Sequence, residues 1–178
     1  KKVCIMGLGY VGLTLAVTLA EIGFDVLGIE INEEILKKLN KGIPHFFEGG
    51  LDGRLKSVIN SKKLRVLKKI PKVCESSVFI ITVGTPIDKK NRVNKKMITN
   101  VCNEISEHLK ENNLVILRST VEVGTTKRLQ KEILKKRKIN FDIAFCPERT
   151  IEGKAMIELR KLPQIIGTNN MTTSSRLS

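Results

Sequence analysis

The sequence predicts an α/β protein of the Rossmann-type, doubly wound class, with a mostly parallel six-stranded sheet and helices on both faces. Two observations predict this fold. A buried strand at the amino end runs into a glycine-rich turn and a helix, and apolar strands then alternate with amphipathic helices along the chain. Such alternation is typical of parallel sheets, because a crossover must join each parallel strand to the next.

The first unit has the spacing of a dinucleotide-binding motif. The strand at residues 2–6 leads into Gly-Leu-Gly-Tyr-Val-Gly at 7–12. Gly7 allows the tight turn, Gly9 lets a pyrophosphate approach the backbone, and Gly12 lets the next helix pack close to the strand. That helix, expected over about residues 10–22, would point its free N–H groups and positive dipole end at the phosphates.

An acidic residue completes this unit. The second strand, residues 25–29, delivers Glu30, whose carboxylate can accept hydrogen bonds from both hydroxyls of a ribose. Glu30 would repel a 2′-phosphate, and residues 31–34 contain no arginine to hold one. The unit therefore predicts NAD rather than NADP as the cofactor. The alternative is a glycine-rich turn without a ligand.

The remaining elements follow from apolar periodicity and capping residues. Asn32 is expected to cap one helix, and Thr125 or Thr126 another. Helices are expected over about residues 32–40, 51–60, 97–110 and 125–136, and strands over 64–67, 77–83, 114–117, 141–145 and, as a last short one, 164–166.

The composition bounds the class of protein. The 178 residues suit one domain or slightly more, and a hydrophobic content of 41% is enough for a core. The longest apolar runs are too short to span a bilayer, and the first is a strand rather than a signal peptide. The 4 cysteines form no Cys-x-x-Cys pair, which indicates a reduced, cytoplasmic protein with neither a disulfide framework nor a metal site.

The net charge of +14 admits two interpretations. One is nucleic-acid binding. The other, a solvated lysine-rich surface, is favoured because the charges are scattered as doublets and aromatic residues make up only 4% of the chain, too few for base-stacking platforms. We therefore expect neither a nucleic-acid nor a membrane partner. The excess charge would still attract a phosphate-bearing cofactor and a nucleotide-linked substrate.

Polar residues follow several of the predicted strands, and the carboxyl ends of parallel strands form the ligand-binding edge of such sheets. The pairs are Thr85 and Pro86, Ser119 and Thr120, and Glu148 and Arg149. A carboxylate beside a nicotinamide site can accept or return the proton that an alcohol oxidation releases, directly or through water.

Each of these residues also has a structural interpretation. Thr85 can shape the turn before proline, Thr120 can cap a backbone N–H, and Glu148 can form an ion pair with Arg149. Cys146 is interpreted as a small strand-end residue rather than a nucleophile, because nothing nearby in the sequence would activate it.

Four motifs occur in order: Gly-Leu-Gly-Tyr-Val-Gly-Leu at 7–13, Val-Gly-Thr-Pro at 83–86, Ser-Thr-Val with Gly-Thr-Thr at 119–126, and Pro-Glu-Arg with Glu-Gly-Lys-Ala at 147–155. Together they resemble the NAD-binding half of the UDP-glucose/GDP-mannose dehydrogenase family, over about residues 2–167. Arg149 and the segment 158–167 look most like the UDP-N-acetyl-D-mannosamine dehydrogenase branch, because the UDP-glucose branch more often has Phe after Pro-Glu.

The resemblance implies an NAD-dependent oxidoreductase of polysaccharide biosynthesis, which oxidises the C6 alcohol of a UDP-hexose to the uronic acid with two NAD. It implies cofactor contacts at Gly7, Gly9, Tyr10, Val11, Gly12, Glu30, Thr85, Pro86, Ser119 and Thr120, and substrate contacts at Arg149, Thr150, Glu152 and Lys154. It makes Glu148 an acid/base or water-orienting group, assisted by Thr120 and Glu152. The family's catalytic Cys, Lys, Asn and Asp lie beyond Ser178, and Cys146 does not match that Cys.

The resemblance also divides the chain. Residues 1–167 are expected to form the NAD-binding domain, and 168–178 a polar linker that starts a central helix, with the catalytic carboxyl-terminal part absent. The missing initial Met fits a piece of a longer protein. The full-length protein is expected to be a homodimer, and this chain alone an inactive monomer. The chain departs from the family's usual pattern at three places. Gly49 replaces a Pro, residues 122–123 replace a Pro-containing pair, and Thr168 replaces a Gly. These departures leave the substrate branch open.

Other functions stay open at this point. A UDP-glucose or UDP-N-acetylglucosamine 6-dehydrogenase would share the same motifs. A β-hydroxyacid dehydrogenase has a similar opening, although the motifs at 147–155 argue against it. A nucleotide-binding module that is not catalytic is the third alternative.

Overall fold

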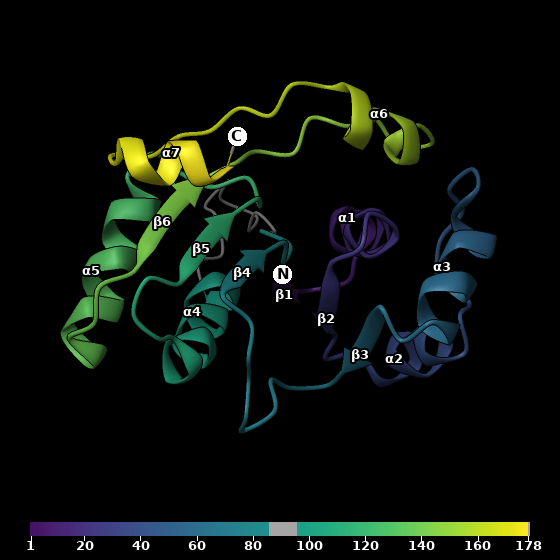
Figure 1. Ribbon diagram of the computed structural model, residues 1–178, viewed down its shortest axis with the longest axis horizontal. Helices are drawn as coiled ribbons and strands as arrows, with labels where there is room; N and C mark the ends of the chain where they lie inside the picture. The colour runs from purple at the N-terminus through teal and green to yellow at the C-terminus, as the bar shows by residue number, and fades with distance from the viewer. Residues whose placement is uncertain (86–95, 178) are drawn as a thin grey trace, which may run out of the picture.

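A computed structural model describes residues 1–85 and 96–177 of the chain (Figure 1). The strands are β1 (Lys2–Met6), β2 (Asp25–Ile29), β3 (Leu64–Leu67), β4 (Val78–Ile81), β5 (Leu114–Leu117) and β6 (Asp142–Phe145). The helices are α1 (Tyr10–Glu21), α2 (Glu33–Asn40), α3 (Leu51–Asn60), α4 (Lys96–His108), α5 (Thr125–Arg137), α6 (Ala155–Lys161) and α7 (Met171–Leu177).

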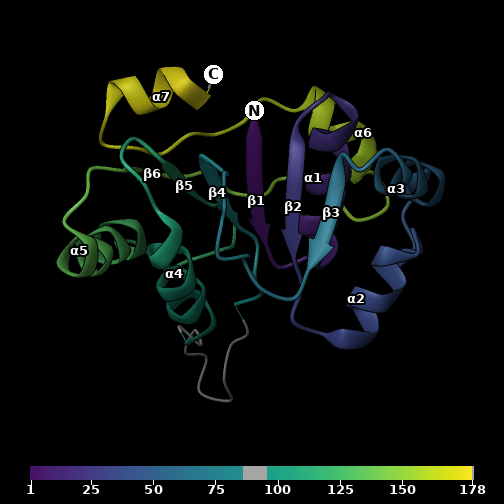
Figure 2. The same cartoon turned by 60° about the horizontal axis from the view of Figure 1, so that its bottom comes forward.

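The six strands form one sheet in the order β3-β2-β1-β4-β5-β6, and every strand pairing is parallel. The order reverses direction at β1, which lies beside both β2 and β4 (Figure 2). This is the doubly wound arrangement, whose ligands bind at the carboxyl ends of the strands beside that reversal. The predicted fold class is confirmed.

Two apolar cores lie on opposite faces of the sheet, because successive strand side chains point to opposite sides. Val3 and Ile5 of β1 pack into the core beneath α1 and α3, together with Met156 of α6. Cys4 and Met6 point into the other core, beneath α4 and α5. All four side chains of β1 from Val3 to Met6 are buried, which makes this strand the centre of the protein.

Helix α1 packs so closely against the turn that follows β1 that no side-chain atom fits between them at Gly12. A Cβ atom on Gly12 would lie 1.9 Å from the carbonyl oxygen of Gly7 and 2.7 Å from Oγ1 of Thr82. The hydroxyl of Thr82 in turn lies 2.7 Å from the same carbonyl oxygen, as its hydrogen-bond donor. Glycine at position 12 therefore sets how closely the helix approaches the sheet.

The elements predicted between residues 2 and 145 are confirmed to within a few residues at their ends. Asn32 caps α2 as predicted, because its side-chain oxygen accepts the backbone N–H groups of Glu34 and Ile35 at 3.0 and 3.2 Å. Thr125 and Thr126, the two residues expected as caps of α5, lie inside its first turn instead, because the helix begins at Thr125. Among the described residues, no helix is long and apolar enough to span a membrane.

One prediction near the carboxyl end is wrong. The strand predicted at 164–166 is absent, and only a single antiparallel bridge forms there, between Phe145 and Gly167. The Gln164 side chain instead donates to the carbonyl oxygens of Pro147 and Ile165, so local contacts replace strand pairing. The segment 168–178, expected to be a polar linker that starts a helix, contains α7, which begins at Met171.

We expect Gly12→Ala to lower the free energy of unfolding by about 2–3 kcal/mol, because the added methyl group meets backbone rather than a movable side chain. Urea denaturation measures this. Gly53→Ala is the matched control, because that glycine lies in α3 with open space around it, and alanine there should stabilise the helix by about 0.5–1 kcal/mol. Equal effects of the two substitutions would contradict the close packing of α1.

Candidate functional site

The glycine-rich turn joins β1 to α1 at the carboxyl edge of the sheet. Gly7 has a φ of +92°, which favours glycine, and its N–H donates to the carbonyl oxygen of Ile29 at 2.9 Å. Gly9 is the N-cap of α1 and supplies no side-chain cap. A Cβ on Gly9 would meet no atom within 4 Å, so the space in front of the first helical turn is open. These features fit a pyrophosphate at the N-terminus of α1.

Glu30 stands at the end of β2 with its carboxylate fixed against the same turn. Oε2 accepts the N–H of Leu8 at 3.1 Å, and Oε1 accepts the N–H of Asn32 at 2.8 Å. Only 8% of the residue is exposed. Each oxygen retains a second lone pair, so the carboxylate fits the two hydroxyls of a ribose. The donor set of the turn and this acid together fit a dinucleotide.

The polar residues at the ends of β4 and β5 shape this edge. Ser119 is buried, and its hydroxyl donates to the carbonyl oxygen of Val83 at 2.6 Å, which ties the two strand ends together. Thr85 is half-buried, and Thr120 is exposed on the rim. Pro86, predicted as a cofactor contact, lies outside the described residues.

Glu148, just after β6, forms an ion pair with Arg118, which directly follows β5. The guanidinium Nε and Nη2 atoms donate to Oε2 at 2.9 and 2.8 Å, and both side chains are mostly buried. Oε1 accepts the backbone N–H groups of Arg149 and Thr150 at 2.7 and 2.8 Å. Arg118 also donates to the side-chain oxygen of Gln164 at 2.6 Å.

These contacts hold the pKa of Glu148 below its ordinary range. Partial burial alone would raise the pKa of this carboxyl, but the N–H groups of Thr150 and Arg149 and the charge of Arg118 outweigh it. Glu148 therefore stays anionic at neutral pH. Its carboxylate places a fixed negative charge at the end of β6, and the backbone N–H groups at the start of the following loop point toward that charge.

The ion pair considered between Glu148 and Arg149 is replaced by the pair with Arg118. The Arg149 side chain instead donates to the carbonyl oxygen of Pro163 at 2.9 Å. Thr150 is half-buried, whereas Glu152 and Lys154 are exposed on the loop before α6. The predicted substrate residues thus lie on one continuous loop between β6 and α6.

Sequence reasoning missed Glu48, a buried carboxyl in the loop between α2 and α3. Its Oε2 lies 2.5 Å from the hydroxyl of Tyr10 and 2.8 Å from the N–H of Gly153, and its Oε1 accepts the N–H of Met156 at 3.4 Å. The residue is 1% exposed. Glu48 thereby connects the glycine turn to the loop that carries Glu152 and Lys154.

Cys146 is buried, and burial raises the pKa of its thiol. This agrees with its interpretation as a packed strand-end residue. The other cysteines are also free and buried, and burial raises the pKa of Cys102 to about 12. Within the described ranges, no group of three or more His, Cys, Asp or Glu side chains is placed to hold a metal ion.

A cavity of about 1060 Å³ lies elsewhere, along the outer edge of β6. Its walls come from α5, from α7 and from the loop before α5, and include Val123, Phe145 and Arg176. None of the residues of the glycine turn lines it. The candidate site is instead the open carboxyl edge between the glycine turn, Glu30 and the loop after β6, where the fixed donors and acceptors converge.

The parallel sheet, the glycine turn and the tethered Glu30 define a dinucleotide-binding domain of the Rossmann class. The sequence profile described as "UDP-glucose/GDP-mannose dehydrogenase family, NAD binding domain" matches residues 1–178. The chain belongs to this family of dehydrogenases and corresponds to the family's NAD binding domain. Its cofactor is NAD.

The similar proteins include dehydrogenases of one branch. A UDP-N-acetyl-D-mannosamine dehydrogenase of Pyrococcus horikoshii is 33% identical over 170 residues, which cover 93% of this chain and 40% of that protein. One of Campylobacter jejuni is 37% identical, covering 94% of this chain and 43% of that protein. The solved structure of a UDP-D-ManNAc dehydrogenase from Pyrococcus horikoshii superposes with a TM-score of 0.94 at 31% identity, over 99% of this chain and 43% of that one. The chain thus spans less than half the length of these relatives.

We expect Arg118→Met to lower the free energy of unfolding by about 3 kcal/mol at pH 7, because it leaves the carboxylate of Glu148 buried without its cation. Arg160→Met is the control, since Arg160 pairs with Glu21 at an exposed position and should contribute less than about 1 kcal/mol.

The same pair predicts a dependence on pH. Because the folded pKa of Glu148 is lowered, its stabilising contribution is fully present above the unfolded value of about 4.3 and is lost as the pH falls through the folded value. The stability difference between the wild type and Arg118→Met should therefore shrink in urea titrations below about pH 4. A difference that stays constant from pH 7 to pH 3 would contradict this assignment.

Proposed function

We propose that this chain is the cofactor-binding domain of a nucleotide-sugar 6-dehydrogenase. The whole enzyme would oxidise the C6 alcohol of a UDP-hexose to the uronic acid, with two NAD, in the cytoplasm. The proposed substrate is UDP-N-acetylmannosamine, which the names of the similar proteins from Pyrococcus horikoshii and Campylobacter jejuni support. The whole enzyme would be a homodimer, and this chain alone a monomer.

The observation that carries the proposal is the pairing of an open helix N-terminus with a tethered acid. The first turn of α1 faces open space at Gly9, and Glu30 is held 3.1 Å from the N–H of Leu8 in the same turn. NAD supplies the hydride acceptor of the reaction when it is bound. The first-turn N–H groups, including those of Tyr10 and Val11, would bind its diphosphate, and Glu30 the adenosine ribose.

The strand ends would complete the site. Thr85 and Thr120 would donate hydrogen bonds toward the cofactor, since Thr85 is half-buried and Thr120 exposed at the strand ends, while buried Ser119 ties the ends of β4 and β5 together. Arg149, Thr150, Glu152 and Lys154 lie on the loop after β6 and would contact the sugar nucleotide. Positive side chains on that loop suit a diphosphate.

Glu148 is proposed to orient water or a substrate hydroxyl, assisted by Thr120 and Glu152, rather than to exchange a proton. Its carboxylate is paired with Arg118 and accepts two backbone N–H groups. A carboxylate whose pKa lies below its ordinary range is a poor general base at neutral pH, since its conjugate acid is too strong. It can still accept a hydrogen bond and fix its donor in place.

A UDP-glucose or UDP-N-acetylglucosamine 6-dehydrogenase would use the same cofactor geometry, so purified enzyme from the complete gene must be assayed with all three sugar nucleotides. A screen of small hydroxy acids with the same enzyme separates a β-hydroxyacid dehydrogenase. Activity with none of these compounds would favour a nucleotide-binding module.

We expect the chain to bind NAD⁺ with at least tenfold preference over NADP⁺, and Glu30→Ala to weaken NAD⁺ binding by about tenfold to a hundredfold. The loss arises because two charge-assisted hydrogen bonds to the ribose disappear. Calorimetric titration measures both affinities, with Glu33→Ala as a control because that carboxylate pairs with Lys68 on the surface. Tighter binding of NADP⁺ by the wild type would overturn the choice of NAD.

We further expect the 178-residue chain to bind NAD⁺ but to catalyse no NAD⁺ reduction with UDP-N-acetylmannosamine. The residues placed at the site include no exposed thiol, because all four cysteines are buried. Absorbance at the NADH band over several hours measures turnover. Steady NADH formation by the purified chain would refute this expectation.

A further inference from the structure

One hydrogen-bonded cluster joins the cofactor turn to the loop that precedes α6. Tyr10 is the first residue of α1 and lies within the glycine turn. Its hydroxyl lies 2.5 Å from Oε2 of Glu48 and accepts the N–H of Gly153 at 2.9 Å. The same N–H also lies 2.8 Å from Oε2 of Glu48. Three segments that are distant in the sequence therefore meet at one carboxyl oxygen.

Burial gives this cluster its importance. Glu48 is almost completely buried, so the groups that face it determine whether its carboxyl is tolerated there. These groups are the phenol of Tyr10 and the N–H groups of Gly153 and Met156. Gly153 has a φ of +86°, which places its N–H toward the cluster in a conformation that favours glycine.

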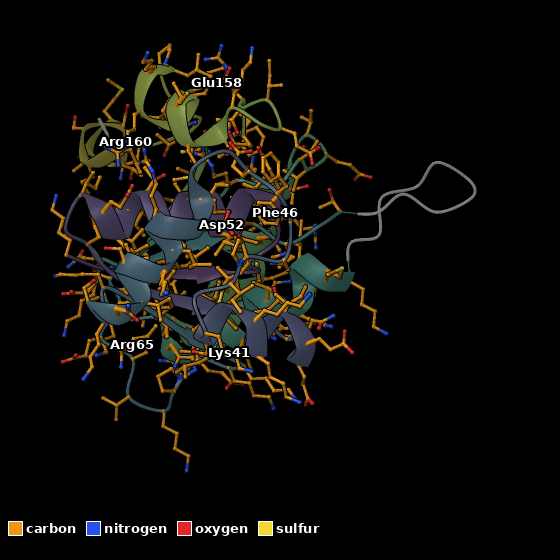
Figure 3. All side chains as sticks on the ribbon, turned by 90° about the vertical axis from the view of Figure 1, so that its right-hand side faces the viewer. Lys41, Phe46, Asp52, Arg65, Glu158 and Arg160 are labelled. Atoms are coloured by element: carbon orange, nitrogen blue, oxygen red, sulfur yellow. The ribbon has the colours of Figure 1, made fainter. Side chains whose placement is uncertain are left out.

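The cluster holds only the beginning of α6. The far end of that helix is tied to α1 by a separate, exposed contact, in which Arg160 donates to Glu21 at 2.7 Å. Figure 3 shows Arg160 and Glu158 on α6, and Phe46 in the loop between α2 and α3. The ring of Phe46 lies 5.0 Å from that of Tyr10 and supports it from the side. The two ends of α6 can therefore be tested separately.

We propose that Tyr10 and Glu48 are a positioning pair, which couples occupation of the cofactor turn to the placement of the loop at 149–154. The inference rests on the proposed function, because it takes NAD to occupy the turn and a sugar nucleotide to contact the loop. Neither residue touches reacting atoms. Their function is to transmit order from one ligand's site to the other's.

The physical basis is the double attachment of Tyr10. Its backbone lies in the first turn of α1, where a diphosphate would fix the N–H groups. Its hydroxyl holds Glu48 and, through the N–H of Gly153, the loop. A ligand that reduces motion of the turn reduces motion of the loop as well, so a second ligand pays less to order it. The two sites then bind with positive cooperativity.

Tyr10 carries its own spectroscopic signal, since the chain contains 1 tyrosine and no tryptophan. Burial and the hydrogen bond to Glu48 raise the pKa of Tyr10 to about 12. In alkaline absorbance titrations, Glu48→Gln should lower the midpoint toward the ordinary value of about 10, with the fold checked by circular dichroism at each pH. Glu21→Gln is the matched control, because Glu21 accepts from Arg160 at the other end of α6, and it should leave the midpoint unchanged. A Glu48→Gln midpoint equal to that of the wild type would overturn the pairing.

Hydrogen–deuterium exchange then tests the coupling. Without ligand, Tyr10→Phe, which keeps the ring and its packing on Phe46, should speed amide exchange at residues 151–156 by about tenfold, while exchange in β4 and β5 stays unchanged. Glu48→Gln should do the same, and Glu21→Gln should not. Unchanged exchange at 151–156 in both cluster variants would refute the positioning role.

With saturating NAD⁺, the wild type should gain protection at residues 9–13 and at 151–156, whereas Tyr10→Phe should gain it at 9–13 alone. Protection of 9–13 without protection of 151–156 in the wild type would overturn the coupling and leave the proposed function intact. Protection of neither segment would refute the proposed function, and the comparison without ligand would then decide alone whether the pair positions the loop.

Discussion

The contact between α1 and the turn after β1 is the constraint on which the rest of the structure depends. Gly12 lies so close to the carbonyl oxygen of Gly7 that the helix axis, the turn and the strand form one rigid unit. The hydroxyl of Thr82 fixes the same carbonyl oxygen from β4. The open N-terminus of α1 is therefore aimed along the carboxyl edge of the sheet, where the other functional groups lie.

Three carboxyl groups act around this unit in a common way. Glu30, Glu48 and Glu148 each accept backbone N–H groups from the loop that follows or faces them. Each thereby organises main chain around a fixed acceptor. Glu30 anchors the glycine turn, Glu148 anchors the loop after β6, and Glu48 connects the two. Most of the site consists of loops. Its three acceptor carboxylates are nevertheless fixed, because Glu30 and Glu148 follow strand ends and Glu48 is buried.

Local patterns were enough to predict most of the fold and the cofactor half of the site. The apolar runs that become β1, β2, β4 and β5 are buried in the structure, and Glu30 follows its strand at the spacing that the motif requires. The strand predicted at 164–166 does not form, because a short run of apolar residues is not enough to make a strand. Ile165 is 52% exposed, and its carbonyl oxygen accepts a hydrogen bond from the Gln164 side chain instead of from a partner strand.

The contacts that the sequence could not reveal are long-range ones. Glu48 has no pattern of its own, and its burial depends on Tyr10 and Gly153, which are distant along the chain. Arg118 did carry a signal: a charged residue that directly continues the buried strand Leu114–Leu117 requires a partner. Which of several nearby acids would pair with it depends on the register of β5 and β6, which places Leu117 beside Phe145.

The buried cysteines have a practical consequence. Cys4, Cys74, Cys102 and Cys146 are distributed over β1, the segment before β4, helix α4 and the end of β6. Since burial shields these thiols, an alkylating reagent should reach each of them only when the surrounding region opens. Labelling rates at the four positions would therefore map the local opening free energy across both cores, and no cysteine would have to be introduced by mutation.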